Sequence, residues 1–211
     1  MKALVSTALL LLCIVGYSES AGAQEEVRVQ PVDVYVSGFG GYSLPFNTDV
    51  SSGGFTVQDV ELENSPSFGG KIGLWVTAPR KTLGIDIGAE VDVTHFNPDP
   101  TLNATYFGVN LMARLPMGVG PELPNGRWFP YVGLGGGAQR LSVEVFGYKE
   151  GNTVPAFQGL GGVKVFVLKH VALFAEGKFT HASHRQVFHG FSPVDFTVNA
   201  VHGVGGLSLH F

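Results

Sequence analysis

The residues best suited to nucleophilic chemistry lie close together in the last quarter of the chain. His181, Ser183 and His184 follow one another, and Asp195 comes a short way beyond them. A serine hydrolase needs a hydroxyl nucleophile, an imidazole base and an acid that orients the imidazole. Ser183, His181 and Asp195 are the candidates for these three roles. The alternative, which we favour, is that they are polar residues where a strand leaves a membrane.

Histidine side chains are also common ligands of Zn²⁺ and Cu²⁺. Five of them crowd the same quarter of the chain: His181, His184, His189, His202 and His210. Their spacing places no three of them on one face together with a carboxylate or a thiol. We therefore expect loop and lumen polarity rather than a metal site, and we expect no cofactor.

These residues lie in segments where apolar side chains recur at every second position. The clearest such segment runs from Leu83 to Thr94, where apolar residues alternate with Gly84, Asp86, Gly88, Glu90 and Asp92. A period of two predicts a strand with two different faces. The same alternation predicts eight strands, at about 32–42, 68–76, 83–94, 105–115, 128–145, 157–167, 171–183 and 196–211. The phase slips near Arg140-Leu141, which predicts a bulge.

The predicted fold is all-β, an eight-stranded antiparallel up-and-down transmembrane β-barrel. Bacterial single-chain barrels have an even number of strands. Open sheet edges cannot lie in lipid, so the first strand should pair with the last. Long connections at 43–67, 95–104, 146–156 and 184–195 are expected to be extracellular loops that could contact an external partner. Shorter connections at 77–82 and 168–170, and a longer one at 116–127, are expected on the periplasmic side.

Nine charged residues fall on the face of these strands that should line the lumen. They are Asp33, Lys71, Asp86, Glu90, Asp92, Arg114, Lys164, Glu176 and Lys178. Charges in a narrow lumen must pair or stay hydrated. They could line an ion pathway, but the interior of an eight-stranded barrel is only wide enough for side chains to fill it. We therefore favour a salt-bridged plug.

The N-terminal residues indicate export. A basic start at Met1-Lys2 precedes an apolar run from Ala8 to Gly16 and the small residues Ala21-Gly22-Ala23. This order is typical of a Sec-type signal peptide cut after Ala23. The expected organisation is a signal peptide at 1–23, a short periplasmic segment at 24–31 and a barrel at 32–211, located in the bacterial outer membrane. The single cysteine, Cys13, would leave with the signal peptide.

The composition favours the same location. Only 14% of the residues are charged, against about 25% in soluble domains, and the mean hydropathy is +0.22. The 30 glycines suit strand corners and crowded lumen positions. The formal net charge of −4 argues against nucleic-acid binding, which needs a basic surface.

Two motifs and the end of the chain resemble a known family. They are Trp128-Phe129-Pro130-Tyr131-Val132-Gly133-Leu134-Gly135-Gly136-Gly137, Leu173-Phe174-Ala175-Glu176-Gly177-Lys178-Phe179 and the aromatic-terminated last strand. The chain is similar to the outer-membrane β-barrel domain family that includes the outer membrane protein A barrel and the opacity-type porin-like proteins. The resemblance implies a structural or surface-interaction role, contact with outer-membrane lipid and lipopolysaccharide, and handling by the barrel-assembly machinery. A narrow, porin-like channel is an alternative within this family.

A second, partial resemblance concerns His181-Ala182-Ser183. It is similar to the His-x-Ser element of the lipid A 3-O-deacylase family, whose serine hydrolase site faces the outer leaflet of an eight-stranded barrel. The asparagine expected after the serine is His184 here. The alternative function is therefore a lipid A hydrolase, while our main expectation is a protein without catalytic activity.

Aromatic side chains are favoured at the two membrane interfaces. Outward positions near the extracellular ends of the strands carry Tyr42, Phe68, Phe107, Phe157 and Phe179, and Trp128 and Phe211 stand on the periplasmic side. By family resemblance, a terminal aromatic such as Phe211 is part of the signal that the assembly machinery reads.

Overall fold

The computed structural model describes residues 29–46, 48–52, 55–60, 62–99, 102–121, 123–145, 148–186 and 194–211. The expected signal peptide at 1–23 and most of the 24–31 segment lie outside these residues. So does His189.

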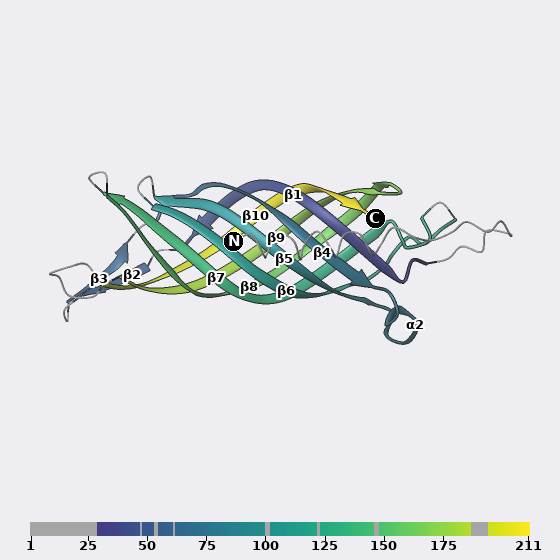
Figure 1. Ribbon diagram of the computed structural model, residues 1–211, viewed down its shortest axis with the longest axis horizontal. Helices are drawn as coiled ribbons and strands as arrows, with labels where there is room; N and C mark the ends of the chain where they lie inside the picture. The colour runs from purple at the N-terminus through teal and green to yellow at the C-terminus, as the bar shows by residue number, and fades with distance from the viewer. Residues whose placement is uncertain are drawn as a thin grey trace, which may run out of the picture.

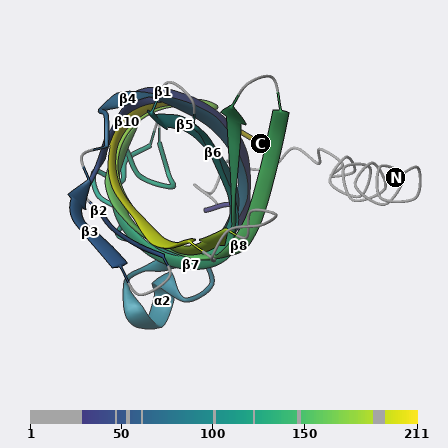
Figure 2. The same ribbon diagram turned by 90° about the vertical axis from the view of Figure 1, so that its left-hand side faces the viewer.

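Eight long antiparallel strands close into a barrel (Figures 1 and 2). They are β1 (Val32–Pro45), β4 (Ser65–Val76), β5 (Asp86–Asp99), β6 (Leu102–Arg114), β7 (Trp128–Val145), β8 (Tyr148–Leu168), β9 (Val171–Gln186) and β10 (Val194–His210). Each pairs with its neighbour in sequence. The barrel closes between the first and the last, with Tyr35 opposite His210 and Pro45 opposite Ala200. The predicted fold and closure are confirmed.

The barrel has two different ends. β1 begins and β10 ends at the same end of the barrel, which we call the terminal end. The opposite end, toward the 43–67 segment, is the loop end. A hairpin of β2 (Thr48–Ser52) and β3 (Phe55–Val60) occupies the segment expected to be a long loop. It pairs with β10 from Val194 to Phe196, beyond the point where β1 stops. Because β10 outruns β1, its backbone groups there are open to another strand.

The other connections at the loop end are shorter than expected. β5 and β6 extend to Asp99 and from Leu102, β7 and β8 extend to Val145 and from Tyr148, and β9 and β10 extend to Gln186 and from Val194. Much of the expected loops 95–104, 146–156 and 184–195 is therefore strand. The polar composition of these segments indicates where the outer surface of the barrel becomes solvated. The backbone hydrogen bonds between strands continue beyond that level.

Two details of the sequence interpretation are wrong. The third strand begins at Asp86 rather than Leu83, because residues Arg80–Leu83 form a helical turn, α2, that ends at Gly84 with φ 72°. The bulge near Arg140-Leu141 does not exist, since both residues keep a regular register with β6 and β8. Leu141 points inward into an apolar cluster and Arg140 points outward. The usual order of outward apolar and inward polar residues is reversed at Arg140 and Leu141, but the alternation of the backbone continues unchanged.

Among the described residues, no helix combines the length and the apolarity needed to cross a bilayer.

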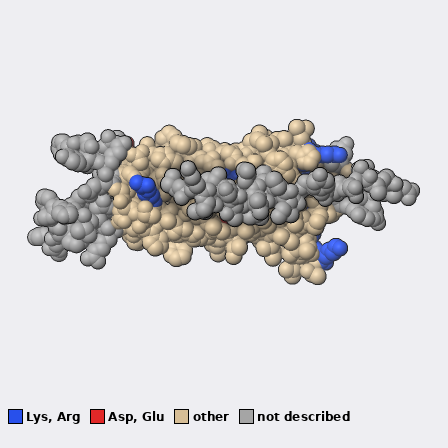
Figure 3. All heavy atoms as spheres, viewed as in Figure 1, with Lys and Arg blue, Asp and Glu red and all other residues tan. Residues whose placement is uncertain are grey.

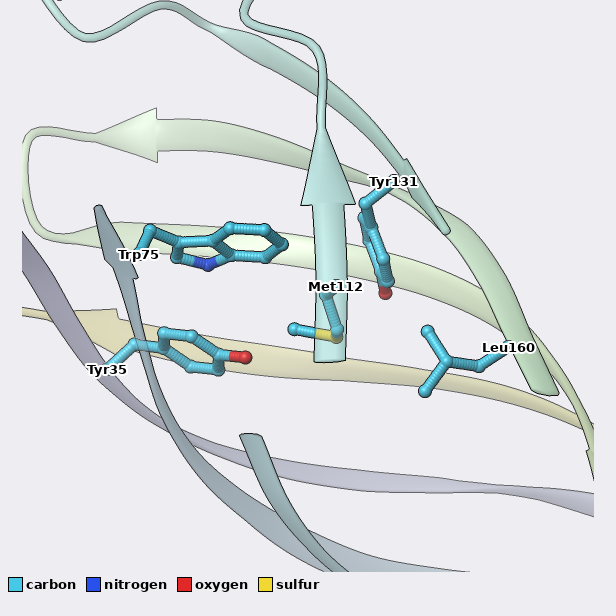
Figure 4. Packing of buried hydrophobic residues seen from close by; sticks show 5 residues of the cluster. All are labelled: Tyr35, Trp75, Met112, Tyr131 and Leu160. Atoms are coloured by element: carbon cyan, nitrogen blue, oxygen red, sulfur yellow. The ribbon is translucent and has the colours of Figure 1, made fainter. Parts of the chain in front are cut away.

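Side chains alternate strictly between the lumen and the outer surface. Figure 4 shows one inward cluster, in which Tyr35, Trp75, Met112, Tyr131 and Leu160 converge from five strands. Outward positions are apolar and exposed, as with Phe68 at 59% and Leu134 at 75%. All seven aromatic residues expected at the interfaces are exposed: Tyr42, Phe68, Phe107, Phe157, Phe179, Trp128 and Phe211. The barrel therefore has its polar groups inside and an apolar surface outside.

Candidate functional site: the charged lumen

The nine charged residues singled out from the sequence all point into the lumen. Each is buried, and none is more than 5% exposed. They come from six strands, β1, β4, β5, β6, β8 and β9. Alternation alone decides their direction, because each occupies the face opposite the exposed apolar residues. Eight of them form three groups along the barrel, and Lys164 lies outside these groups.

The first group, near the terminal end, is built around Arg114. Its Nη1 lies 2.8 Å from Asp33 Oδ2 and its Nε lies 2.8 Å from Asp86 Oδ2. Arg80, in the turn outside the strands, donates to both oxygens of Asp86 at 2.8 and 2.6 Å. His210 Nδ1 lies 2.6 Å from Asp33 Oδ1. Two aspartates are thus each held by two nitrogen-bearing side chains.

The second group, in the middle of the lumen, is centred on Lys71. Its Nζ lies 2.6 Å from both oxygens of Glu176 and 3.4 Å from Glu90 Oε1. Tyr35 donates to Glu90 at 2.6 Å and Tyr131 donates to Glu176 at 2.7 Å. The hydroxyl donors supply contacts to carboxylates that have left water, as buried charges require.

The third group lies toward the loop end. Lys178 Nζ donates to Asp92 Oδ2 at 2.6 Å and to Thr94 Oγ1 at 3.0 Å. It also lies 3.7 Å from Glu176, which joins this group to the middle one, and 3.9 Å from the centre of the Phe39 ring. The three groups thus extend along the lumen.

Lys164 differs from the other lumen cations. Its Nζ contacts Ser208 Oγ at 3.1 Å and His210 Nε2 at 3.3 Å, and lies 3.8 Å from the centre of the Tyr35 ring. No carboxylate of the described residues lies within ion-pair distance of it. It lines a cavity of about 10 Å³ together with Glu90 and Trp75, which is about the room one water needs.

Apolar side chains lie beyond the charges toward each end. At the loop end, Phe96, Leu141 and Val198 pack with Ala104 and Ala200. At the terminal end, Phe129, Phe166 and Ala172 pack together, with Leu123 of the 115–127 connection against them. The charged groups are therefore flanked by apolar clusters on both sides.

Sequence reasoning missed four polar partners in this network. Tyr35, Tyr131 and His210 occupy inward positions. The alternation of the sequence predicts that direction, but it does not predict which residues they contact. Arg80 lies outside the strands, and its reach back to Asp86 depends on the helical turn of α2. Period-two analysis carries no signal for a residue in a turn.

The candidate hydrolase residues do not assemble into a triad among the atoms described. His181 Nδ1 is 2.6 Å from Asn199 Oδ1, and Ser183 Oγ is 3.3 Å from Thr197 Oγ1. Each therefore bonds across to β10 rather than to the other, and both face outward near the loop end. The backbone of Asp195 pairs with Arg185, but its side chain lies outside the described residues.

The histidines are dispersed. His184, His202 and His210 are buried and point inward, whereas His181 faces outward. His202 bonds Ser43 and Thr180, while His210 bonds Asp33. In the part of the chain that the structure describes, no three His, Cys, Asp or Glu side chains are grouped so that they could hold a metal ion.

No known family model matches the sequence, and no curated protein matches it. Solved structures do match. The N-terminal β-barrel domain of Pseudomonas aeruginosa OprF is 12% identical with a TM-score of 0.50, covering 85% of this chain and 97% of that one. Neisserial surface protein A is 17% identical with a TM-score of 0.48, covering 86% and 98%. Ail, the attachment invasion locus protein of Yersinia pestis, is 10% identical with a TM-score of 0.47, covering 86% and 100%.

At these identities the likeness concerns the fold alone, and it rests on the OprF domain. The resemblance found in the sequence motifs is thereby confirmed at the level of architecture. This chain has the closed eight-stranded fold of the outer-membrane β-barrels.

Proposed function

We propose that this chain is an integral protein of the bacterial outer membrane, with a structural or surface-interaction role and a lumen closed by its own ion pairs. It acts without catalysis. The observation that carries the proposal is the burial of nine charged side chains, eight of them in ion-paired groups, inside a barrel whose outer surface is apolar.

The outer surface supports the membrane location. Figure 3 shows a wall of mostly uncharged residues, with Lys and Arg mainly toward the ends. On β4 the exposed apolar residues run from Val76 to Phe68. That distance is roughly 27 Å along a strand and roughly 20 Å after a tilt of about 40°. It approaches the apolar band of about 25 Å that such barrels present to lipid.

The contacts inside support a plug. A conducting lumen needs a continuous hydrated path, whereas Lys71, Glu176, Lys178 and Asp92 are each less than 6% exposed and bonded to one another. Apolar clusters lie toward both ends of these groups. Packing of this kind makes the barrel rigid.

The main test of location is fractionation combined with heat modifiability. A closed barrel resists SDS in the cold, because unpairing a strand exposes backbone groups that detergent cannot satisfy. We expect the mature protein in the outer-membrane fraction, with a different gel mobility before and after boiling. A soluble, heat-insensitive protein would refute the proposal.

The hydrolase alternative has its own test. We expect no release of the 3-linked acyl chain from lipid A, with either the wild type or Ser183→Ala, because Ser183 and His181 bond β10 residues instead of each other. Acyl release that disappears in Ser183→Ala would replace our proposal by the hydrolase.

A further inference from the structure

The outer surface changes from apolar to polar at a defined level near the loop end. On β7 the outward residues Val132, Leu134, Gly136 and Ala138 are followed by Arg140. The neighbouring strands switch at the same level, since outward Phe107 on β6 is followed by Thr105. If the barrel spans the membrane as proposed above, this level is the boundary between acyl chains and headgroups.

Arg140 is exposed at this boundary. Among the side chains that the structure describes, none makes a hydrogen bond or an ion pair with its guanidinium. Glu144 is four residues further along β7, which separates the two Cα atoms by about 13 Å. Arg114, which lies on β6 and points inward, holds two aspartates in the lumen. Arg140 thus offers the headgroup layer a cation that no described side chain neutralises.

Hydrogen-bonding side chains flank Arg140 on both sides. Thr105 lies directly opposite it on β6 and Thr153 directly opposite on β8, and His95 lies opposite Thr105 on β5. Directly opposed side chains have Cβ atoms about 5 Å apart. His95 Nδ1 bonds Thr105 Oγ1 at 2.9 Å, and the His95 ring lies 5.2 Å from the Phe68 ring. The four residues make a continuous polar row, which ends at Phe68, the partner of His95 on β4.

The guanidinium lies over bare backbone on the side toward the loop end. A Cβ atom placed on Gly151 would be 3.4 Å from Arg140 Nε and 3.5 Å from its Nη2. Gly151 is opposite Ser142, two residues closer to the loop end than Arg140. The Arg140 side chain therefore reaches away from the apolar band, and the glycine leaves its fork open to an approaching group. A guanidinium fork matches the oxygens of a phosphate in two parallel bonds.

We propose that the row His95, Thr105, Arg140 and Thr153 binds the phosphate of a phosphorylated lipid headgroup in the outer leaflet. Arg140 supplies the charge and the bidentate donor. Thr153 donates its hydroxyl proton to a remaining phosphate oxygen, and Thr105 does the same when His95 Nδ1–H donates to the Thr105 hydroxyl. This inference rests on the proposed outer-membrane location. It identifies the part of the wall that would contact lipopolysaccharide.

The test uses the full mature protein, refolded into phosphatidylcholine nanodiscs in the presence of EDTA, so that divalent cations do not bridge the charges. Binding of bis-phosphorylated lipid A and of dephosphorylated lipid A is titrated for the wild type, Arg140→Gln and Arg127→Gln. Arg127 is the matched control, because it is exposed at the terminal end of the barrel. Inorganic phosphate is titrated separately as a non-lipid source of the same group.

We expect the wild type and Arg127→Gln to prefer the phosphorylated lipid, and Arg140→Gln to lose about tenfold in affinity for it only, which is the scale of one charge-assisted contact. Thr105→Val with Thr153→Val should lower the same affinity. An unchanged preference in Arg140→Gln, or an equal loss in Arg127→Gln, would overturn the site. Saturation of the Arg140-dependent signal by inorganic phosphate alone would overturn the lipid as the ligand.

Failure of this inference differs from failure of the proposed function. A protein that enters the nanodiscs and is heat-modifiable, but whose lipid preference ignores Arg140, contradicts the phosphate site only. A protein that does not enter the bilayer contradicts the outer-membrane location, and the site with it.

Discussion

Replacing Lys178 by methionine removes the cation from a fully buried ion pair of the lumen. Lys178 Nζ lies 2.6 Å from Asp92 Oδ2, and the side chains of both residues have 0% exposure. At that distance the attraction is about 6 kcal/mol for an effective dielectric constant of about 20. Much of it only offsets the cost of taking both charges out of water. The variant instead leaves Asp92 with Thr94 as its neighbour and no cation.

Loss of one partner of a buried pair costs about 3–5 kcal/mol, because the remaining charge is uncompensated. We therefore expect Lys178→Met to lower the free energy of unfolding by this amount. The double variant Asp92→Asn with Lys178→Met should recover at least about half of it, since neither site then carries a charge. Lys81→Met, on the exposed turn α2, should change the free energy by less than about 0.5 kcal/mol.

The assay is urea unfolding in phospholipid vesicles, followed by tryptophan fluorescence and by cold SDS gels. The wild type, Lys178→Met, Asp92→Asn and the double variant form a double-mutant cycle. A loss below about 1 kcal/mol in Lys178→Met, or a double variant that loses the sum of the two single losses, would refute the reasoning.

Three further predictions concern packing, the turns and assembly. Gly41→Ala should destabilise the barrel by about 1–3 kcal/mol, since its Cβ would lie 2.1 Å from the Gly203 carbonyl oxygen. The control is Gly38→Ala on the same strand, whose Cβ would meet nothing within 4 Å; equal effects of the two substitutions on urea unfolding would contradict the contact. Arg80→Gln should speed amide exchange in the 77–85 turn, because Arg80 joins Asp86 to the Asn125 carbonyl; Lys81→Gln is the control, and unchanged exchange would show that Arg80 does not hold the turn. Deleting Phe211 should lower the amount of folded protein in the outer membrane while refolding into detergent is largely kept, because one interfacial ring contributes at most about 3 kcal/mol; normal membrane levels would remove the assembly signal, and failure in detergent would show a defect of stability.

The direction of side chains was predictable from the sequence because a strand has a fixed period of two. Asp86, Glu90 and Asp92 alternate with apolar residues, so one face had to be polar whichever way the barrel closed. The period of two gave a wrong result at Leu141. Its side chain points inward although it is apolar, and the preceding arginine points outward, so the sequence looks as if the alternation had shifted by one residue. Periodicity reports the usual chemistry of a face, and a boundary between lipid and water changes that chemistry.

The partners within the lumen were not predictable. Lys71 on β4 bonds Glu176 on β9, although these strands are not neighbours in the sheet. Such contacts cross the barrel and depend on its diameter and on the reach of each side chain. The β2–β3 hairpin was missed for a related reason: its place is set by how far β10 extends beyond β1.

Conductance across a planar bilayer tests the central claim, that ion pairs and apolar clusters close the lumen, most directly. The refolded protein, shown to be inserted by its heat modifiability, is recorded beside a known open porin under the same conditions. We expect no steady single-channel steps, because Lys71, Glu176, Lys178 and Asp92 occupy the path between the two apolar clusters. Steady current steps whose size changes in Lys71→Met or Glu90→Gln would contradict the account and make the lumen an ion pathway.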